Sequence, residues 1–159
     1  MEACREAASW NRLLRIAVNV SAAQFRRENL DAQVRKALRS GLSLARLELE
    51  ITEGVLIEDV SRAKKTMQSL KSLGILIALD DFGTRYSSLS YIEAFPLDRI
   101  KIYRAFVASL GQNERSLAIV RAVIGLAQGL GVPVLAEGIE TKVQMSLLVQ
   151  EAAMRCKAT

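Results

Sequence analysis

Short apolar runs and longer stretches with helical spacing follow one another along the chain. Five runs that are β-branched, alternating or wholly apolar predict strands, at residues 16–21, 47–52, 75–80, 98–103 and 132–137. The third run is almost entirely apolar, which is typical of a strand buried on both faces. Pro133 lies in the first residues of the last run, where its missing N–H is tolerated.

Helices are predicted between these strands, because capping residues and glycines bracket three amphipathic stretches. The cap and stop pairs are Asn29 with Gly41, Asp59 with Gly74, and Asn113 with Gly131. The predicted helix after Asp59 has an apolar stripe on one side and a basic outer face on the other. The outer face contains Arg62, Lys64, Lys65 and Lys71. A shorter helix is predicted to begin at Ser87 or Ser88, ahead of Pro96.

Alternating strands and helices indicate βαβ units and a parallel sheet. A doubly wound open sheet and a (β/α)8 barrel both fit this order. The barrel is favoured because polar residues end five successive strands, and barrel active sites are built at that face. These residues are Asn19, Glu50, Asp80, Lys101 and Glu137. We therefore predict a partial (β/α)8 barrel with about five of its eight units, although a curved sheet with open edges remains the alternative.

The composition fits one folded domain and excludes several kinds of site. The chain has 159 residues, of which 50% are hydrophobic and 25% are charged, and its net charge is +5. It contains no histidine, which rules out Ser-His-Asp and Cys-His catalysis and imidazole metal sites in this chain. Cys4 and Cys156 match no metal or redox spacing and predict free thiols in the cytosol. No apolar run is long enough for a membrane span, and no signal peptide is recognised.

The candidate chemistry lies in acidic and amide side chains that follow the predicted strands. The set is Asn19, Glu50, Asp80, Asp81, Lys101 and Glu137, with Glu53 and Glu140 close behind. Converging carboxylates repel one another unless a cation lies among them. Two divalent ions about 4 Å apart, held by such oxygens, can clamp a hydroxide and a phosphate in phosphoester hydrolysis. Because neighbours in a strand point to opposite faces, Asp80 and Asp81 can share a site only where the strand ends.

Each of these residues also has an ordinary structural interpretation. Asp80 or Asp81 could be a helix cap, Asn19 and Glu137 could belong to turns, and Glu50 and Lys101 could be solvated. The functional interpretation depends on all five strand ends carrying such a group.

The run from Asp81 to Leu89 resembles the metal-site loop of the EAL-domain family of bacterial cyclic di-GMP phosphodiesterases. Matching segments occur in the family's order across nearly the whole chain. They are residues 18–21 with Gln24 and Phe25, 48–53, 80–84, 86–89, 100–102 and 136–140.

The resemblance implies a (β/α)8 barrel and hydrolysis of cyclic di-GMP to linear pGpG with one or two Mg2+ or Mn2+ ions. By resemblance, the metal ligands are Asn19, Glu50, Asp80, Asp81 and Glu137. Lys101 is matched to the residue that assists the water, Glu53 steadies the loop over residues 81–88, and Glu140 supports the site. The family's dimer interface uses the same loop, and its members are often parts of longer multidomain signalling proteins.

The chain departs from the family pattern in four places. The first strand with the Glu-Ala-Leu motif and the last strands are not found, so residues 1–159 are interpreted as a single truncated domain. Tyr103 stands where an acidic residue is usual, and Arg85 stands where glycine is usual. These departures predict reduced hydrolysis.

Three functional hypotheses follow from this pattern. The first is an impaired cyclic di-GMP phosphodiesterase. The second is an inactive module that binds cyclic di-GMP or a protein partner. The third is a remnant of a longer protein without an independent role. None of the three expects a nucleic-acid polymer as partner.

Overall fold

The computed structural model describes residues 6–7, 14–27, 30–39, 41–84 and 92–156. The predicted short helix at Ser87 or Ser88, together with Arg85, Asn29 and Cys4, lies outside these residues. The chain divides into two compact units. Unit 1 contains residues 1–79 and 88–98, and unit 2 contains residues 80–87 and 99–159.

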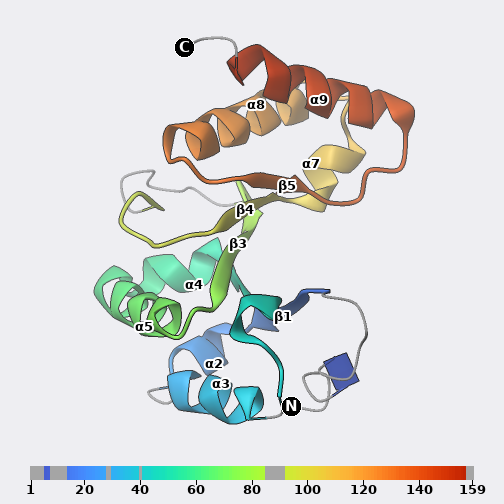
Figure 1. Cartoon of the computed structure of the whole chain (residues 1–159). Helices are drawn as coiled ribbons and strands as arrows, with labels where there is room; N and C mark the ends of the chain where they lie inside the picture. Colours follow the sequence, from blue (N-terminus) through green and yellow to red (C-terminus); the bar gives the residue numbers. More distant parts are fainter. Residues whose placement is uncertain (1–5, 8–13, 28–29, 40, 85–91, 157–159) are drawn as a thin grey trace. The chain divides into compact units, whose positions relative to one another are not determined.

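Five strands form one sheet in the order β1-β2-β3-β4-β5, which is also their order along the chain (Figure 1). Their bounds are β1 Ile16–Val20, β2 Leu47–Thr52, β3 Leu76–Phe82, β4 Arg99–Ile102 and β5 Val134–Ala136. The β1–β2 and β4–β5 ladders are parallel. All five predicted strands are confirmed, and the second is found at its predicted bounds.

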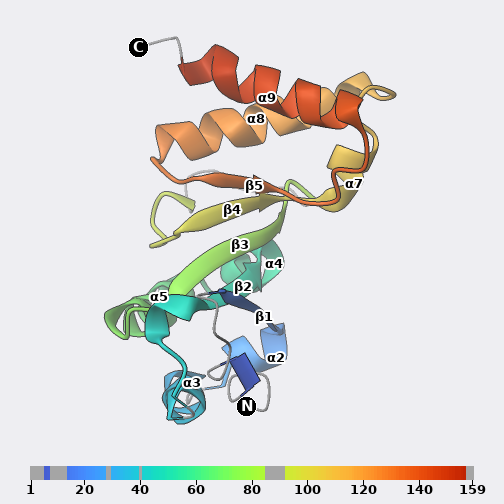
Figure 2. The same ribbon diagram turned by 45° about the vertical axis from the view of Figure 1, so that its right-hand side comes forward.

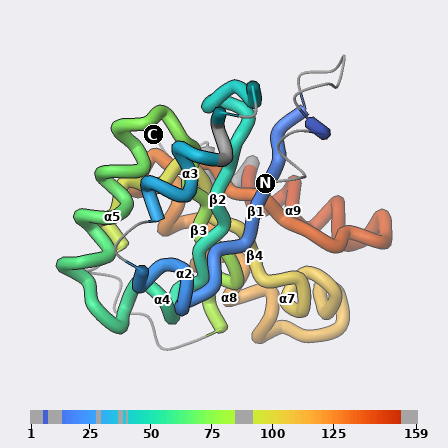
Figure 3. The backbone as a smooth tube through the Cα atoms, turned by 90° about the horizontal axis from the view of Figure 1, so that it is seen from below, coloured from blue at the N-terminus to red at the C-terminus, as the bar shows by residue number. Residues whose placement is uncertain are grey.

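Unit 1 combines β1, β2 and the first residues of β3 with several helical segments. They are α2 Ala22–Phe25, α3 Leu30–Leu38, the 3-10 turn η1 Leu44–Arg46, α4 Glu53–Glu58 and α5 Val60–Ser72. The α3 and α5 helices pack side by side (Figure 3). Asp59 caps α5 as predicted, because its carboxylate accepts a hydrogen bond from the Arg62 N–H at 3.0 Å. The buried stripe of α5 contains Ala63, Met67 and Leu70.

Within unit 1, the partly buried carboxylate of Asp98 links the start of β3 to the α5 helix. Asp98 forms an ion pair with the Lys71 ammonium at 2.6 Å and accepts the Ile77 N–H at 2.8 Å. The Asp98 N–H in turn donates to the Ile77 carbonyl at 2.9 Å. One aspartate therefore satisfies a backbone donor and a cation together.

Unit 2 places helices α7 Arg104–Ala108, α8 Glu114–Gly129 and α9 Lys142–Cys156 beside β4 and β5. The α8 helix packs on β4 and on α9. In Figure 1 and Figure 2 it lies between β5 and α9. Asn113 caps α8 as predicted. Val120, Ile124 and Ala127 on its inner face are buried. Glu151 of α9, which is 3% exposed, holds the Arg121 guanidinium of α8 with two hydrogen bonds of 2.8 Å.

No helix in the described residues is long and apolar enough to cross a membrane.

Candidate functional site

In unit 2, two carboxylates contact one buried ammonium at the ends of β3, β4 and β5, and the Asp81 carboxylate lies near enough to interact with its charge. The Lys101 Nζ atom lies 3.2 Å from Asp80 Oδ1 and 3.1 Å from Glu137 Oε1. Lys101 itself is only 3% exposed, so the alternative of a solvated lysine is wrong. A buried ammonium is strongly destabilising without counterions, and these two carboxylates supply them.

Asp81, the next residue after Asp80, has an unusual backbone conformation. The β3 strand does not stop at Asp80 as expected but runs on to Phe82. Asp81 has a φ of 54°, which is uncommon for a residue with a side chain. Burial and then the negative charge of Asp80 raise the pKa of the Asp81 carboxyl, while Lys101 and Arg104 oppose this rise. The charged form of Asp81 is therefore disfavoured at this strand end, first by its burial and then by the neighbouring carboxylate.

The turn after Asp81 requires glycine at position 83. Gly83 has a φ of 90°, and a Cβ there would lie 3.3 Å from the Phe106 ring. The Thr84 hydroxyl closes the turn by donating to the Asp81 carbonyl at 2.9 Å. The turn is thus set by sterics and a local hydrogen bond.

Unit 1 brings Asn19 and Glu50 together in the β1–β2 ladder. The two residues are Cα partners in the parallel register. Glu50 is 7% exposed, so the alternative of a solvated outer-face residue is wrong. Asn19 is exposed, and Glu53 is buried as the first residue of α4. Each of the three lies within two residues of the carboxyl end of a strand.

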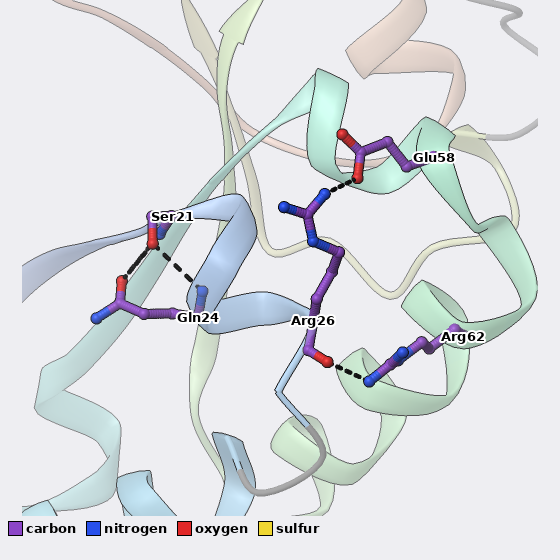
Figure 4. Close-up of polar contacts among 5 residues, drawn as sticks. All are labelled: Ser21, Gln24, Arg26, Glu58 and Arg62. Carbon is purple, nitrogen blue, oxygen red and sulfur yellow. Dashed lines mark hydrogen bonds and ion pairs between the residues drawn. The ribbon is translucent and has the colours of Figure 1, made fainter.

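A capping box fixes the chain directly after Asn19. Ser21 is the N-cap of α2, and its hydroxyl accepts the Gln24 N–H at 3.3 Å while Gln24 Oε1 accepts the Ser21 N–H at 3.0 Å (Figure 4). This reciprocal pair satisfies two donors that a helix start leaves open. The sequence pattern Ser-x-x-Gln is the local signal for this capping box.

Gln144 fixes the loop that carries Glu137 and Glu140 through a similar set of hydrogen bonds. This residue was not identified from the sequence. Its Oε1 accepts the N–H groups of Glu140 at 2.8 Å and Thr141 at 2.9 Å. Its Nε2 donates to the Ala108 carbonyl at 3.2 Å, and the Gln144 N–H donates to the Thr141 hydroxyl at 3.2 Å. Gln144 is 6% exposed and so joins this loop to α7. The pattern Thr-x-x-Gln was the available signal.

Chemically, the oxygen-rich groups suit a hard divalent cation. Among the described residues, however, no three acidic or thiol side chains are arranged to hold a metal ion. In unit 2, the Lys101 ammonium is the positive charge that lies between Asp80 and Glu137. Glu140 is exposed and is fixed through its backbone N–H.

We predict that Asp81→Asn stabilises the protein near neutral pH. A raised carboxyl pKa means that the folded state binds a proton more readily than the unfolded chain, so the charged form carries a penalty at neutral pH. Asparagine removes that penalty and tolerates the positive φ. Thermal unfolding of metal-free protein should show a melting temperature about 1–3 °C higher. The gain should shrink as the pH falls through the raised pKa; a pH-independent gain or a loss at neutral pH would contradict this explanation.

We predict that Gln144→Ala destabilises the protein by about 1–3 kcal/mol, because buried donors and acceptors lose their partners. Denaturant unfolding measures the change. Gln150→Ala is the matched control, since it lies exposed on the same helix. Equal effects of the two substitutions would show that the Gln144 hydrogen bonds do not fix the loop.

The sequence matches a family model described as "EAL domain" over residues 1–156. An uncharacterized signaling protein of Caulobacter vibrioides is 50% identical over 147 residues, which cover 92% of this chain and 18% of that protein. The cyclic di-GMP phosphodiesterase NbdA of Pseudomonas aeruginosa is 40% identical over 136 residues, which cover 85% of this chain and 17% of that protein. The chain thus spans about a fifth of the relatives that it matches.

Solved structures agree with this assignment. The PaMucR phosphodiesterase in complex with cyclic di-GMP superposes with a TM-score of 0.89 at 37% identity, covering 94% of this chain and 63% of that one. Klebsiella pneumoniae BlrP1, with calcium and cyclic di-GMP, superposes with a TM-score of 0.81 at 27% identity. The match covers 94% of this chain and 39% of the BlrP1 chain. These likenesses are consistent with the predicted partial barrel. The family resemblance found in the sequence is therefore confirmed, and the chain belongs to the EAL domain family.

Proposed function

We propose that this chain is a cyclic di-GMP phosphodiesterase domain that opens the cyclic dinucleotide to linear pGpG. In this reaction water adds to one phosphorus, the P–O3′ bond breaks, and the freed 3′ oxygen takes a proton. The observation that carries the proposal is the Lys101 ammonium held between Asp80 and Glu137, with Asp81 beside them. The relatives named as phosphodiesterases and the cyclic di-GMP complexes support the choice of substrate.

Lys101 is proposed to hold the attacking water or to neutralise charge that develops on the phosphate. Its ammonium is already fixed by two carboxylates, so little reorganisation is needed during the reaction. Burial lowers the effective dielectric around it and strengthens its pull on an anion. Supporting roles are proposed for Glu53, which would steady the loop over residues 81–88, and for Glu140.

Divalent metal ions are proposed to be held by Asp80, Asp81 and Glu137 in unit 2 and by Asn19 and Glu50 in unit 1. Every group in this set offers an oxygen, which is the type of donor that hard divalent ions prefer. Burial raises the pKa of the Asp81 carboxyl, and the negative charge of Asp80, which raises it further, would also favour a cation nearby. BlrP1 has been solved with calcium and with manganese, which supports a divalent ion here. Bound metal would supply an activated water and a counter-charge for the phosphate.

The chain is further proposed to act within a longer signalling protein, because its curated relatives are about five times its length. A homodimer formed through the loop over residues 81–88, and the cytosolic location expected from the free cysteines, remain predictions.

A binding module without turnover is the second candidate, and Tyr103 favours it. Tyr103 follows β4 and is the N-cap residue of α7. Its ring packs edge to face on the Phe106 ring, with 5.7 Å between the ring centroids. A neutral phenol is a weaker metal ligand than a carboxylate. Tyr103→Asp restores a carboxylate there and offers a better N-cap.

We predict that purified chain incubated with cyclic di-GMP and Mn2+ or Mg2+ releases pGpG, detected on a nucleotide-resolving column. Glu50→Gln should lower the rate at least about 100-fold, because it removes a charged oxygen while keeping the size of a buried side chain. Tyr103→Asp should raise the rate.

Three outcomes separate the candidates. Product that Glu50→Gln abolishes supports the enzyme. Binding of cyclic di-GMP without product, in both the chain and Tyr103→Asp, supports the binding module. Neither product nor binding with either metal contradicts the proposed function.

A further inference from the structure

A polar hollow lies in unit 1 between the start of α3 and one face of α5. Its volume is about 330 Å3. Seven residues line it, namely Arg27, Leu30, Asp31, Arg62, Lys65, Thr66 and Ser69. None of them belongs to the candidate site described above.

The α5 helix presents a continuous row of hydrogen-bond donors to this hollow. Arg62, Lys65, Thr66 and Ser69 are spaced i, i+3, i+4 and i+7, which places them on one face of the helix. This face lies beside the buried stripe that begins at Ala63, and α3 packs against the same helix. Positions next to a helix–helix contact commonly carry apolar side chains. Here they carry two cations and two hydroxyls instead.

Within the residues that the structure describes, the cations around the hollow form no ion pair with a carboxylate, unlike other cations of unit 1. Arg26 pairs with Glu58 at 2.6 Å, and Lys71 pairs with Asp98 as described above. In the described part of the chain, Arg27 and Lys65 form no ion pair.

Arg62 donates a hydrogen bond to the Arg26 carbonyl, which orients its guanidinium without neutralising it (Figure 4). The remaining charged group of the lining is the Asp31 carboxylate in the first turn of α3. Among the described residues of the lining, three cations therefore accompany a single anion, so this lining carries excess positive charge.

We propose that this hollow binds the phosphate group of a small molecule. Arginine and lysine recognise phosphate through charge-assisted hydrogen bonds, and arginine adds a planar fork of donors. The Thr66 and Ser69 hydroxyls offer two further donors on the same face. The volume lies near the lower end of small-ligand pockets, about 300–1,000 Å3, which suits a phosphate group with a small attachment. Asp31 weakens this attraction and so limits the affinity.

The test is a calorimetric titration of the whole chain in EDTA, with inorganic phosphate, pyrophosphate and ATP as separate probes. EDTA removes divalent ions, so the outcome is independent of the proposed phosphodiesterase activity. Arg27→Gln and Lys65→Gln should each weaken pyrophosphate binding about 5- to 10-fold, since each removes one charge-assisted contact. Asp31→Asn should tighten it. Lys64→Gln is the matched control, because it removes the same charge from the neighbouring exposed residue, which does not line the hollow.

Pyrophosphate binding that is weakened by Arg27→Gln and Lys65→Gln, tightened by Asp31→Asn and unchanged by Lys64→Gln supports the site. Equal affinity for pyrophosphate and ATP means that the phosphates alone are recognised, whereas tighter ATP binding means that the nucleoside also contributes. Weakening by Lys64→Gln as large as by Lys65→Gln would show only diffuse surface attraction and overturn the proposal. So would the absence of binding by all three probes at millimolar concentration.

Discussion

The buried ammonium of Lys101 is the interaction on which the candidate site depends. An ammonium that is 3% exposed needs counterions, and Asp80 and Glu137 provide them from the ends of the strands on either side of β4. The same contact holds two carboxylates near each other that would otherwise repel. A parallel sheet makes this arrangement available, because the carboxyl ends of its strands lie at one edge.

Local hydrogen bonding then sets the turns that leave the strands. Ser21 with Gln24 fixes the start of α2, two residues after Asn19, and Thr141 with Gln144 fixes the start of α9 after Glu137. Both are capping boxes of the same kind. Each strand-to-helix connection is short, so a fixed helix start also limits where the preceding strand end can lie. The stability of these turns and the positions of the candidate site residues are therefore linked.

The strands and the principal helices could be predicted from the sequence because their signals are local. The alternation over residues 47–52 and the Asp59 cap reflect side-chain periodicity and hydrogen bonding within a few residues. The α9 helix was not predicted, since exposed Val143, Met145 and Val149 interrupt its polar face. The short α4 helix begins directly after β2 and leaves no loop to mark it.

The candidate site was predictable as a set of strand ends but not in its details. Burial of Lys101 depends on two partners 21 residues before it and 36 residues after it, which no local pattern reveals. No local pattern in the sequence predicts that β3 extends to Phe82 or that Asp81 adopts a positive φ. The metal-binding roles of Asn19, Glu50, Asp80, Asp81 and Glu137 and the catalytic roles of Lys101, Glu53 and Glu140 remain predictions.

The most direct test of this account is thermal unfolding of the chain and of Lys101→Met, with and without Mn2+. If Lys101 supplies the positive charge that the strand-end carboxylates require, the variant is less stable without metal. Mn2+ should then raise its melting temperature by more than it raises that of the unmodified chain, because the ion replaces the missing charge. A variant whose melting temperature does not respond to Mn2+, or responds less than the unmodified chain, would contradict the assignment of these carboxylates to a cation site.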